Sequence, residues 1–346
     1  MNLRQVARAA GLSVAATSFA LRDSPKVSLA TRVRVRELAL QLGYQADARV
    51  IEAMRHIRKP REARQSACLA VCSFYDHPRP WEKSTHLSRV YSGMKQRAEQ
   101  VGYRLEPLWL RAPGMTYRRF RGILQARGLE GMLCFGSSDV DQLFPSEINL
   151  CAIVTVGLSI RTRLHRVVSH SFADTTVALD RLHQLGYRRP GLVVSNYEEQ
   201  RSARAHTAAY LAWCERHLGL HAAMPILRVD EVEGAAVLGW LGRHKPEAIV
   251  VVHQGTELLL LRSALRKAGV RVPGDLGVLA ISPVLEGTDF AGLEENQSLI
   301  GRWAVELLAA RIANRDFGIP LDPRVEMVES QWHEGNSLRV FKSVNC

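Results

Sequence analysis

Arginine and lysine side chains are concentrated in the first 63 residues of the chain. This segment holds twelve of them against five aspartates and glutamates, a net charge of +7, whereas the whole chain carries +12. Guanidinium and ammonium groups bind phosphates, so the uneven charge indicates a basic head that binds a polyanion and a nearly neutral body with another role. A solvated charged surface would have the same composition.

Between these charges lies the stretch GLSVAATSFALR, Gly11 to Arg22, which offers little polar chemistry. Ser13 is a good N-cap, and the sequence predicts a short helix that runs to about Leu21. One helix face combines Val14, Ala15, Ser18, Phe19 and Arg22, and the other combines Thr17, Ala20 and Leu21. Small side chains let a helix backbone sit deep in the DNA major groove, while flanking basic residues bind phosphates.

Two further helices are predicted around this one. The first begins at Asn2, buries Val6, Ala7 and Ala10, and stops at Gly11. The third is capped by Ser28, ends at Gly43, and has its apolar residues at helical spacing: Val35, Leu38, Ala39 and Leu42. Three short helices, the first two joined by a tight glycine turn, are typical of a helix-turn-helix, although an αα-corner in another small helical domain would look similar.

After a polar, basic linker at residues 45–66, the hydrophobic pattern changes to short apolar runs that alternate with amphipathic helices. Strands are expected within 67–74, 104–110, 129–136, 151–159, 189–195, 247–254 and 276–282, and helices within 88–103, 117–128, 175–187 and 257–270. Such alternation predicts parallel sheets with helical crossovers. About 280 residues exceed the needs of one sheet, so two lobes with a cleft are expected.

Several functional classes lack their sequence signals. The six cysteines form no CxxC pair, and four of them lie in or beside apolar runs, which argues against a disulfide framework or a zinc site. The N-terminus has no apolar signal core, and no apolar run is long enough to span a membrane. No Walker A loop, G-x-S-x-G elbow or H-E-x-x-H motif is present. We therefore expect a cytoplasmic protein that is not an enzyme and uses no cofactor or metal.

The ordered motifs of the chain resemble the lactose/galactose repressor (LacI/GalR) family of bacterial regulators. The resemblance covers nearly the whole chain and rests on residues 3–44, which end in Leu-Gly-Tyr, and on 92–105, 129–136, 182–194, 265–282 and 301–312. It implies an all-α helix-turn-helix head and an α/β effector domain of the periplasmic-binding-protein type with two lobes. The expected boundaries are 1–47 for the head, 48–66 for a hinge or linker, and 67–346 for the effector-binding and dimerisation domain.

The resemblance also implies a function. The expected protein is a homodimeric repressor that binds a pseudo-palindromic operator in double-stranded DNA, without contact with membranes, and responds to a small-molecule effector, a sugar or related metabolite. Three alternatives stay open: a regulator of this type that has lost effector binding, a sugar-binding receptor, and an enzyme on the same α/β body. A periplasmic receptor would need a signal peptide and would not need the basic head.

Matched by position to the family, Val14, Ala15 and Phe19 fall where it reads bases. Their apolar side chains are expected to select thymine methyl groups and groove shape, although Phe19 could instead pack into the helical core. Residues expected to bind or cap toward phosphates are Arg4, Ser13, Ser18, Arg22, Lys26, Ser28, Thr31 and Asp47. The family's minor-groove wedge falls at Ala53, which is too small to intercalate, and the adjacent Met54 could replace it.

The expected effector site departs from the family pattern. The family's ligand-binding arginine is replaced by His206, with Arg201 and Arg204 close by. Its Asn-Asp pair reads His253-Gln254, and its later Asp-Asp pair reads Ser282-Pro283, so carboxylates that would bind sugar hydroxyls are missing there. Segments that could face the cleft contribute Trp81, His86, Trp109 and Glu295. The candidate effector set is therefore Trp81, His86, Arg201, Arg204, His206, Gln254, Ser282 and Glu295.

Overall fold

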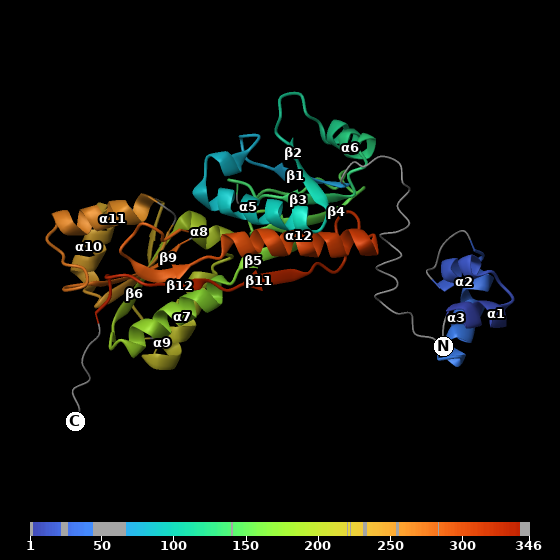
Figure 1. Ribbon diagram of the computed structural model, residues 1–346. Coiled ribbons are helices and arrows are strands. Elements are labelled where there is room, and N and C mark those ends of the chain that lie inside the picture. The colour runs from blue at the N-terminus through green and yellow to red at the C-terminus, as the bar shows by residue number, and fades with distance from the viewer. Residues whose placement is uncertain are drawn as a thin grey trace. The chain divides into compact units, whose positions relative to one another are not determined.

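The computed structural model divides the chain into a helical unit, Met1–Gln65, and an α/β unit, Ser66–Cys346. The structure describes residues 3–21, 27–43, 67–139, 141–219, 221, 223–230, 234–253, 256–282 and 284–339. The linker predicted at 48–66 lies outside these residues. Figure 1 shows the elements of each unit.

The helical unit consists of α1 (Leu3–Ala10), α2 (Val14–Leu21) and α3 (Leu29–Gln41). The Ser13 hydroxyl accepts a hydrogen bond from the Ala16 amide at 3.1 Å, and Ser28 caps α3 by accepting from the Thr31 amide. Gly11 ends α1 with a φ of 66°, which favours glycine. These boundaries agree with the helices predicted from the sequence.

Small residues form the core of the helical unit. Ala10, Ala20 and Val35 are buried together, and four leucine and valine side chains pack around them. Thr17 is buried on the same side of α2. The inward face predicted for α2, which included Thr17 and Ala20, is therefore confirmed.

The α/β unit contains two six-stranded sheets, one in each lobe. The first lobe has the parallel order β11-β5-β4-β3-β1-β2. Its strands are β1 (Ala67–Ser73), β2 (Tyr103–Trp109), β3 (Gly131–Cys134), β4 (Ala152–Val156), β5 (His165–Ser169) and β11 (Val325–Val328). Its helices are η1 (Pro80–Glu82), α5 (Thr85–Gln100), α6 (Tyr117–Ala126) and α12 (Gln297–Asn314).

The second lobe has the order β12-β10-β9-β8-β6-β7, in which only β12 pairs antiparallel among the described strands. Its strands are β6 (Pro190–Ser195), β7 (Leu227–Val229), β8 (Ala248–Val252), β9 (Gly277–Ser282), β10 (Ala291–Glu294) and β12 (Gln331–His333). Its helices are α7 (Ser171–Gln184), α8 (Asn196–Arg201), α9 (Ala205–His217), α10 (Gly234–His244) and α11 (Thr256–Lys267). The predicted fold class, with two parallel-sheet lobes, is confirmed.

The chain crosses between the lobes three times. The crossings join β5 to α7, β10 to α12 and β11 to β12. Both sheets are covered on their two faces by helices or loops, so strands such as β4 and β8 are completely buried and almost wholly apolar. The short strands β5, β7, β10, β11 and β12 were not predicted from the sequence.

Helices α5 and α12 lie side by side in the first lobe (Figure 1). Glycines allow this approach, because a Cβ atom added to Gly301 would lie 2.1 Å from the Val90 carbonyl oxygen. A Cβ on Gly93 would meet the Ser298 carbonyl oxygen at 2.0 Å. Both obstacles are backbone atoms, so they cannot rotate away.

We predict that Gly301→Ala lowers the free energy of unfolding by about 1–3 kcal/mol, because the methyl group forces α5 and α12 apart. Urea unfolding of the full chain measures this change. Gly239→Ala in α10 is the control, since a Cβ there meets no atom within 4 Å and alanine is the better helix former. Equal stability of the two variants would contradict the packing argument.

Candidate functional site

The outward face of α2 carries the residues expected to read bases. Val14 is 43% exposed and Ala15 is exposed, while Phe19 is half-buried and lies outside the cluster that forms the helical core. This face is therefore apolar and accessible along the first two turns of the helix.

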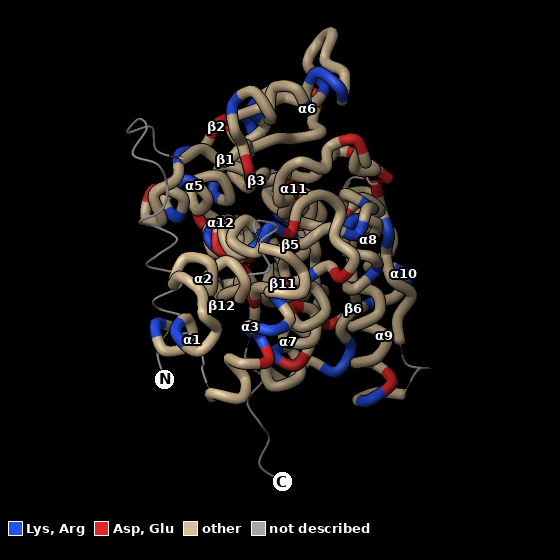
Figure 2. The backbone as a smooth tube through the Cα atoms, turned by 90° about the vertical axis from the view of Figure 1, so that its right-hand side faces the viewer, with Lys and Arg blue, Asp and Glu red and all other residues tan. Residues whose placement is uncertain are grey.

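Polar and basic residues surround that face. Arg4 and Arg8 are exposed on α1, which Figure 2 shows as its basic positions. Ser28, at the start of α3, is also exposed, and its hydroxyl lies 2.9 Å from that of Thr31. Ser13 and Ser18 lie at the start and middle of the α2 segment. The predicted contacts Arg22, Lys26, Asp47, Ala53 and Met54 fall outside the described residues.

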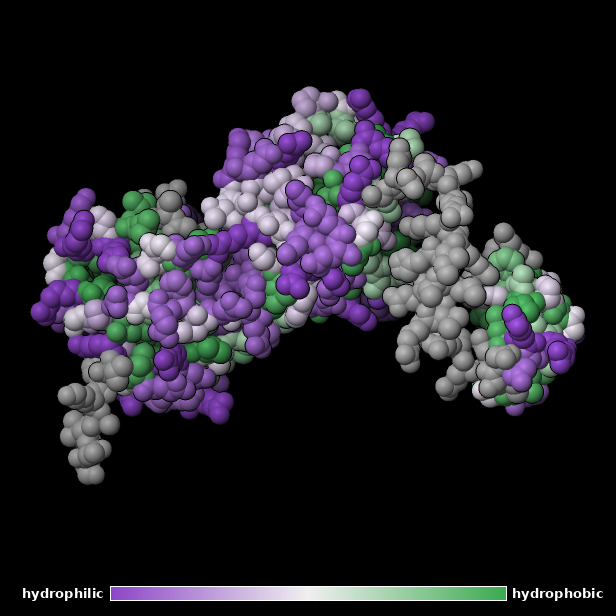
Figure 3. Space-filling view, in the orientation of Figure 1, coloured by the Kyte–Doolittle hydropathy of each residue, from purple (hydrophilic) through white to green (hydrophobic). Residues whose placement is uncertain are grey.

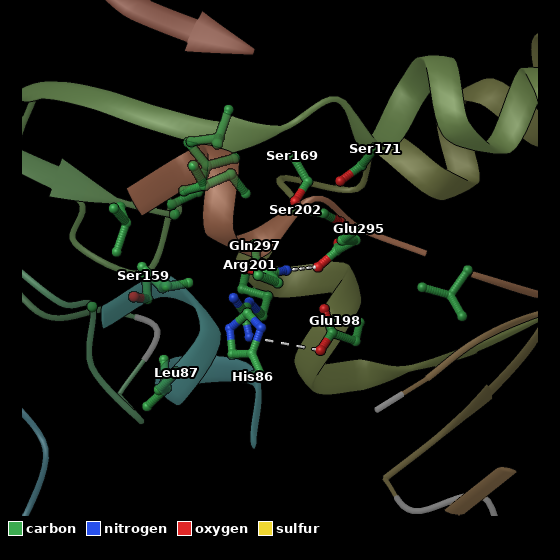
Figure 4. A pocket seen from close by; sticks show the side chains of 18 of the residues that line it. His86, Leu87, Ser159, Ser169, Ser171, Glu198, Arg201, Ser202, Glu295 and Gln297 are labelled. Atoms are coloured by element: carbon green, nitrogen blue, oxygen red, sulfur yellow. Dashed lines mark hydrogen bonds and ion pairs between the residues drawn. The ribbon is translucent and has the colours of Figure 1, made fainter. Parts of the chain in front are cut away.

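A second candidate site is a cavity of about 70 Å³ between the two lobes of the α/β unit. One water needs roughly 10–15 Å³, so the cavity accommodates a compact molecule. The first lobe contributes residues from β4, β5, α5 and the segments that follow β1 and β3, and the second contributes α8 and the ends of β8 and β9. The crossings between the lobes supply Ser169, Ser171, Glu295 and Gln297 (Figure 4).

Arg201 is the central cation of this cavity among the described lining residues. Its guanidinium lies 3.7 Å from the Glu198 carboxylate and 5.5 Å from the centre of the Tyr197 ring. Although Arg201 belongs to the second lobe, a Cβ on Gly157 of the first lobe would come within 3.8 Å of its side chain. The guanidinium therefore bridges the cleft.

Glu295 has an unusually high pKa for a carboxyl group. Burial and, as the second cause, the charge of Glu198 together raise the pKa to about 7 against the opposing influence of Arg201. Asp174, whose charge also acts on Glu295, has its own pKa raised by burial to about 6 despite two hydrogen bonds from Ser330. Carboxyl groups with these values change charge near neutral pH.

His86 enters the cavity from the first turn of α5, close to Arg201 (Figure 4). Burial, together with the charge of Arg201, lowers the pKa of His86 to about 3, so the ring is neutral at pH 7. Its Nδ1 atom is buried and has no hydrogen-bond partner in the described part of the chain. Such an atom costs free energy unless a ligand or water binds it.

An ion-pair cluster lies just outside the cavity. Arg89, one turn after His86 on α5, contacts Glu294 at 2.5 Å and Glu286 at 2.7 Å. Glu294 also accepts hydrogen bonds from the Leu285 and Glu286 amides. The guanidinium belongs to the first lobe and both carboxylates belong to the second, so the cluster ties the lobes together.

Three of the predicted effector residues, His86, Arg201 and Glu295, thus line one cavity. His206 lies behind the cavity wall, where it is buried and its Nδ1 lies 2.8 Å from the Thr175 hydroxyl. Burial lowers the pKa of His206 to about 4. His253, from the replaced Asn-Asp pair, lines the cavity and pairs with Glu257, whereas its neighbour Gln254 is outside the described residues.

The remaining predicted residues do not line the cavity. Trp81 is buried in the first lobe and stacks on Tyr91 at 4.4 Å between ring centres. Arg204 is exposed at the start of α9, and the Ser282 hydroxyl contacts the Val284 backbone. Trp109 donates a hydrogen bond to the Tyr75 carbonyl.

Sequence reasoning missed Glu198, a second carboxylate in the cavity, together with its polar neighbours. These neighbours are Tyr75, Ser159, Ser169, Ser171, Ser202 and Gln297. A usable signal existed for Glu198, because α8 follows β6 directly and ligands of α/β folds bind at the carboxyl ends of parallel strands. The serines carry no such signal, since serine is common in loops.

Two sequence families match different parts of the chain. Residues 2–47 match the family described as bacterial regulatory proteins, lacI family, and residues 179–337 match the periplasmic binding protein-like domain. No curated protein matches the sequence significantly. Among the residues that the structure describes, no helix is both long enough and apolar enough to cross a membrane.

Solved structures share the fold at low sequence identity. The Lac repressor dimer bound to operator and the anti-inducer ONPF has a TM-score of 0.59 at 16% identity, over 98% of this chain and 99% of that one. The transcriptional regulator CelR–cellobiose complex has 0.56 at 18%, over 97% and 99%. The transcription regulator CcpA of Lactococcus lactis has 0.57 at 14%, over 80% and 100%.

We predict that replacing Glu295 changes how stability depends on pH. Because its folded-state pKa of about 7 exceeds the ordinary value of 4.5, its stabilising contribution is complete below pH 4.5 and is lost as the pH rises toward 7. Glu295→Gln cannot ionise, so its melting temperature should fall less than that of the wild type between pH 5 and pH 8.

Differential scanning calorimetry across this pH range measures the two slopes. Glu199→Gln is the matched control, because Glu199 is buried on the same helix as Glu198 but does not line the cavity. Asp174 contributes a slope of the same sign, so Glu295→Gln should reduce the dependence without abolishing it. A wild-type slope in Glu295→Gln would disprove the assignment.

Proposed function

This chain belongs to the LacI family of bacterial regulatory proteins and is a DNA-binding transcriptional regulator, and we propose that it is a repressor. In this proposal a small molecule bound in the interlobe cavity sets the affinity of the protein for its operator. The observation that carries the proposal is the combination of an exposed, apolar α2 face with a separate cavity that holds buried charged groups. A receptor would have no use for the first feature, and a regulator without an effector would have none for the second.

The helix-turn-helix reads DNA with α2 in the major groove. Val14, Ala15 and Phe19 contact thymine methyl groups, and their small or flat side chains let the backbone approach the base edges. Arg4, Ser13, Ser18, Ser28 and Thr31 bind or orient toward phosphates, together with Arg22, Lys26 and Asp47. The phosphate contacts supply most of the affinity, and the apolar face supplies selectivity.

A homodimer binds the operator, because one helix-turn-helix covers only a few base pairs and two of them match a pseudo-palindrome. The Lac repressor structure cited above is described as a dimer on its operator. Hydrophobic side chains are exposed on α11 (Figure 3), where Leu259 is 48% and Leu260 is 62% exposed. Met54, or Ala53 beside it, contacts the minor groove near the operator centre.

The effector acts by changing the relative populations of two lobe arrangements. Its contacts at the crossings, through Ser169, Ser171, Glu295 and Gln297, give it different affinities for the two arrangements. That difference is the coupling free energy passed to the DNA-binding unit. The effector is a sugar or a related polar metabolite, as in the CelR–cellobiose complex. The protein acts in the cytoplasm and catalyses no reaction.

The proposed DNA contacts lead to two predictions, and the first concerns base reading. An operator is selected from random DNA by the full-length protein, and binding is then measured with Phe19→Ala. This variant should lose about 1–3 kcal/mol at the selected operator and almost none on unrelated DNA. Circular dichroism must show an unchanged helical signal. Equal losses on both DNAs with an intact fold would contradict base reading by Phe19.

The second prediction concerns phosphate binding. Arg4→Ala should weaken the binding of all sequences alike, because a phosphate contact carries no sequence information. The slope of log affinity against log salt concentration should decrease in magnitude by about one. Fluorescence anisotropy at several salt concentrations measures this slope. An unchanged slope would exclude Arg4 from the DNA interface.

A further inference from the structure

The interlobe cavity has more negative than positive charge. Glu198 and Glu295 line it, and Asp174 is close enough for its charge to raise the pKa of Glu295. Among the described lining residues, the guanidinium of Arg201 is the only permanent positive charge. His86 and His206 are neutral at pH 7, because burial lowers the pKa of both imidazoles.

Arg201 cannot neutralise both glutamates equally. Its guanidinium is held 3.7 Å from Glu198 and over the Tyr197 ring. Glu295 instead interacts with neutral groups, as a hydrogen-bond acceptor from the Gln297 amide and from Ser169. Its raised pKa reports that these neutral partners do not compensate for burial and for the charge of Glu198.

Four serine hydroxyl groups add polar positions to a wall that also contains apolar side chains such as Leu87, Val156 and Ile281. Ser159, Ser169, Ser171 and Ser202 line it from both lobes (Figure 4). Each hydroxyl both donates and accepts hydrogen bonds. The buried, unpartnered Nδ1 of His86 adds a further polar position.

We propose that the effector is a small hydroxylated amine, whose ammonium group binds the Glu295 carboxylate and whose hydroxyl groups bind the serines and His86. This inference rests on the effector role proposed above for the cavity. It excludes sugar acids and sugar phosphates, because the carboxylates of Glu198 and Glu295 would repel a further anion. A neutral sugar satisfies the hydroxyl positions but leaves the charge of Glu295 unbalanced.

Binding of an ammonium group is linked to proton release. The charged or titratable groups described around Glu295 are Glu198 and Arg201 on α8, Asp174 on α7 and His86 on α5, and His253 and Tyr75 also line the cavity. Near pH 7 part of the Glu295 population is protonated, and a bound cation favours the carboxylate. The ligand therefore displaces a proton, and its affinity increases from pH 5.5 to pH 7. Over this range the ammonium group of an amino sugar, whose pKa is close to the roughly 7.7 of an α-amino group, stays mostly charged.

The test is isothermal titration calorimetry on the full chain with matched hexoses. Glucosamine, galactosamine and mannosamine are each compared with the neutral hexose and with the corresponding hexuronic acid. At least one amine should bind tenfold or more tightly than its neutral counterpart, and its acid should not bind. Titration at pH 6.5, where the amine is already protonated, in two buffers of different ionisation enthalpy should reveal proton release from Glu295. Putrescine, an amine without hydroxyls, should bind more weakly than the best amino sugar.

Glu295→Gln should reduce the affinity for that amine at least tenfold and abolish proton release, whereas Glu199→Gln should bind it like the wild type. Preference for a neutral hexose or an acid, binding of none of the amines, or equal binding of putrescine would overturn the inference. Operator binding is measured on the same preparations. If no ligand releases the protein from its operator, or if the protein does not bind DNA specifically, the result counts against the proposed function instead.

Discussion

Three crossings of the chain between two sheets are the constraint on which the α/β unit depends. Because β11 and β12 follow α12, each lobe is completed only by residues from the end of the chain. Neither lobe can therefore be built from a continuous segment. The same crossings place Ser169, Ser171, Glu295 and Gln297 at the cavity. A ligand there contacts the segments that must bend when the lobes move, which is why a small molecule can influence a large rearrangement.

The sequence was sufficient for the elements that carry their own signal. Runs such as AIVTV and AIVVV are buried throughout and almost wholly apolar because both sheet faces are covered. Ser28 and Gly11 mark helix ends by local chemistry. The short strands β10, β11 and β12 have no comparable pattern. They are strands because their neighbours offer unpaired backbone groups, which is information held by the tertiary structure.

The residues of the candidate cavity were predictable only in part. Arg201 could be found because it lies near the family's ligand-binding arginine, and Glu295 because its segment was expected to face the cleft. Residue type alone could not separate Trp81 from His86, which are five positions apart. The first stacks on Tyr91 inside the lobe and the second faces the cavity, because η1 and α5 turn them in different directions. Only the packed structure decides between such neighbours.

The Arg89 cluster has a consequence for how the molecule responds to its surroundings. Moving the lobes apart separates a guanidinium of one lobe from two carboxylates of the other, so part of the work of opening is electrostatic. Dissolved ions screen these partly exposed charges and reduce that work. The same ions compete for DNA phosphates with the basic helical unit. Ionic strength therefore acts both on the affinity for DNA and on the ion pairs that join the two lobes.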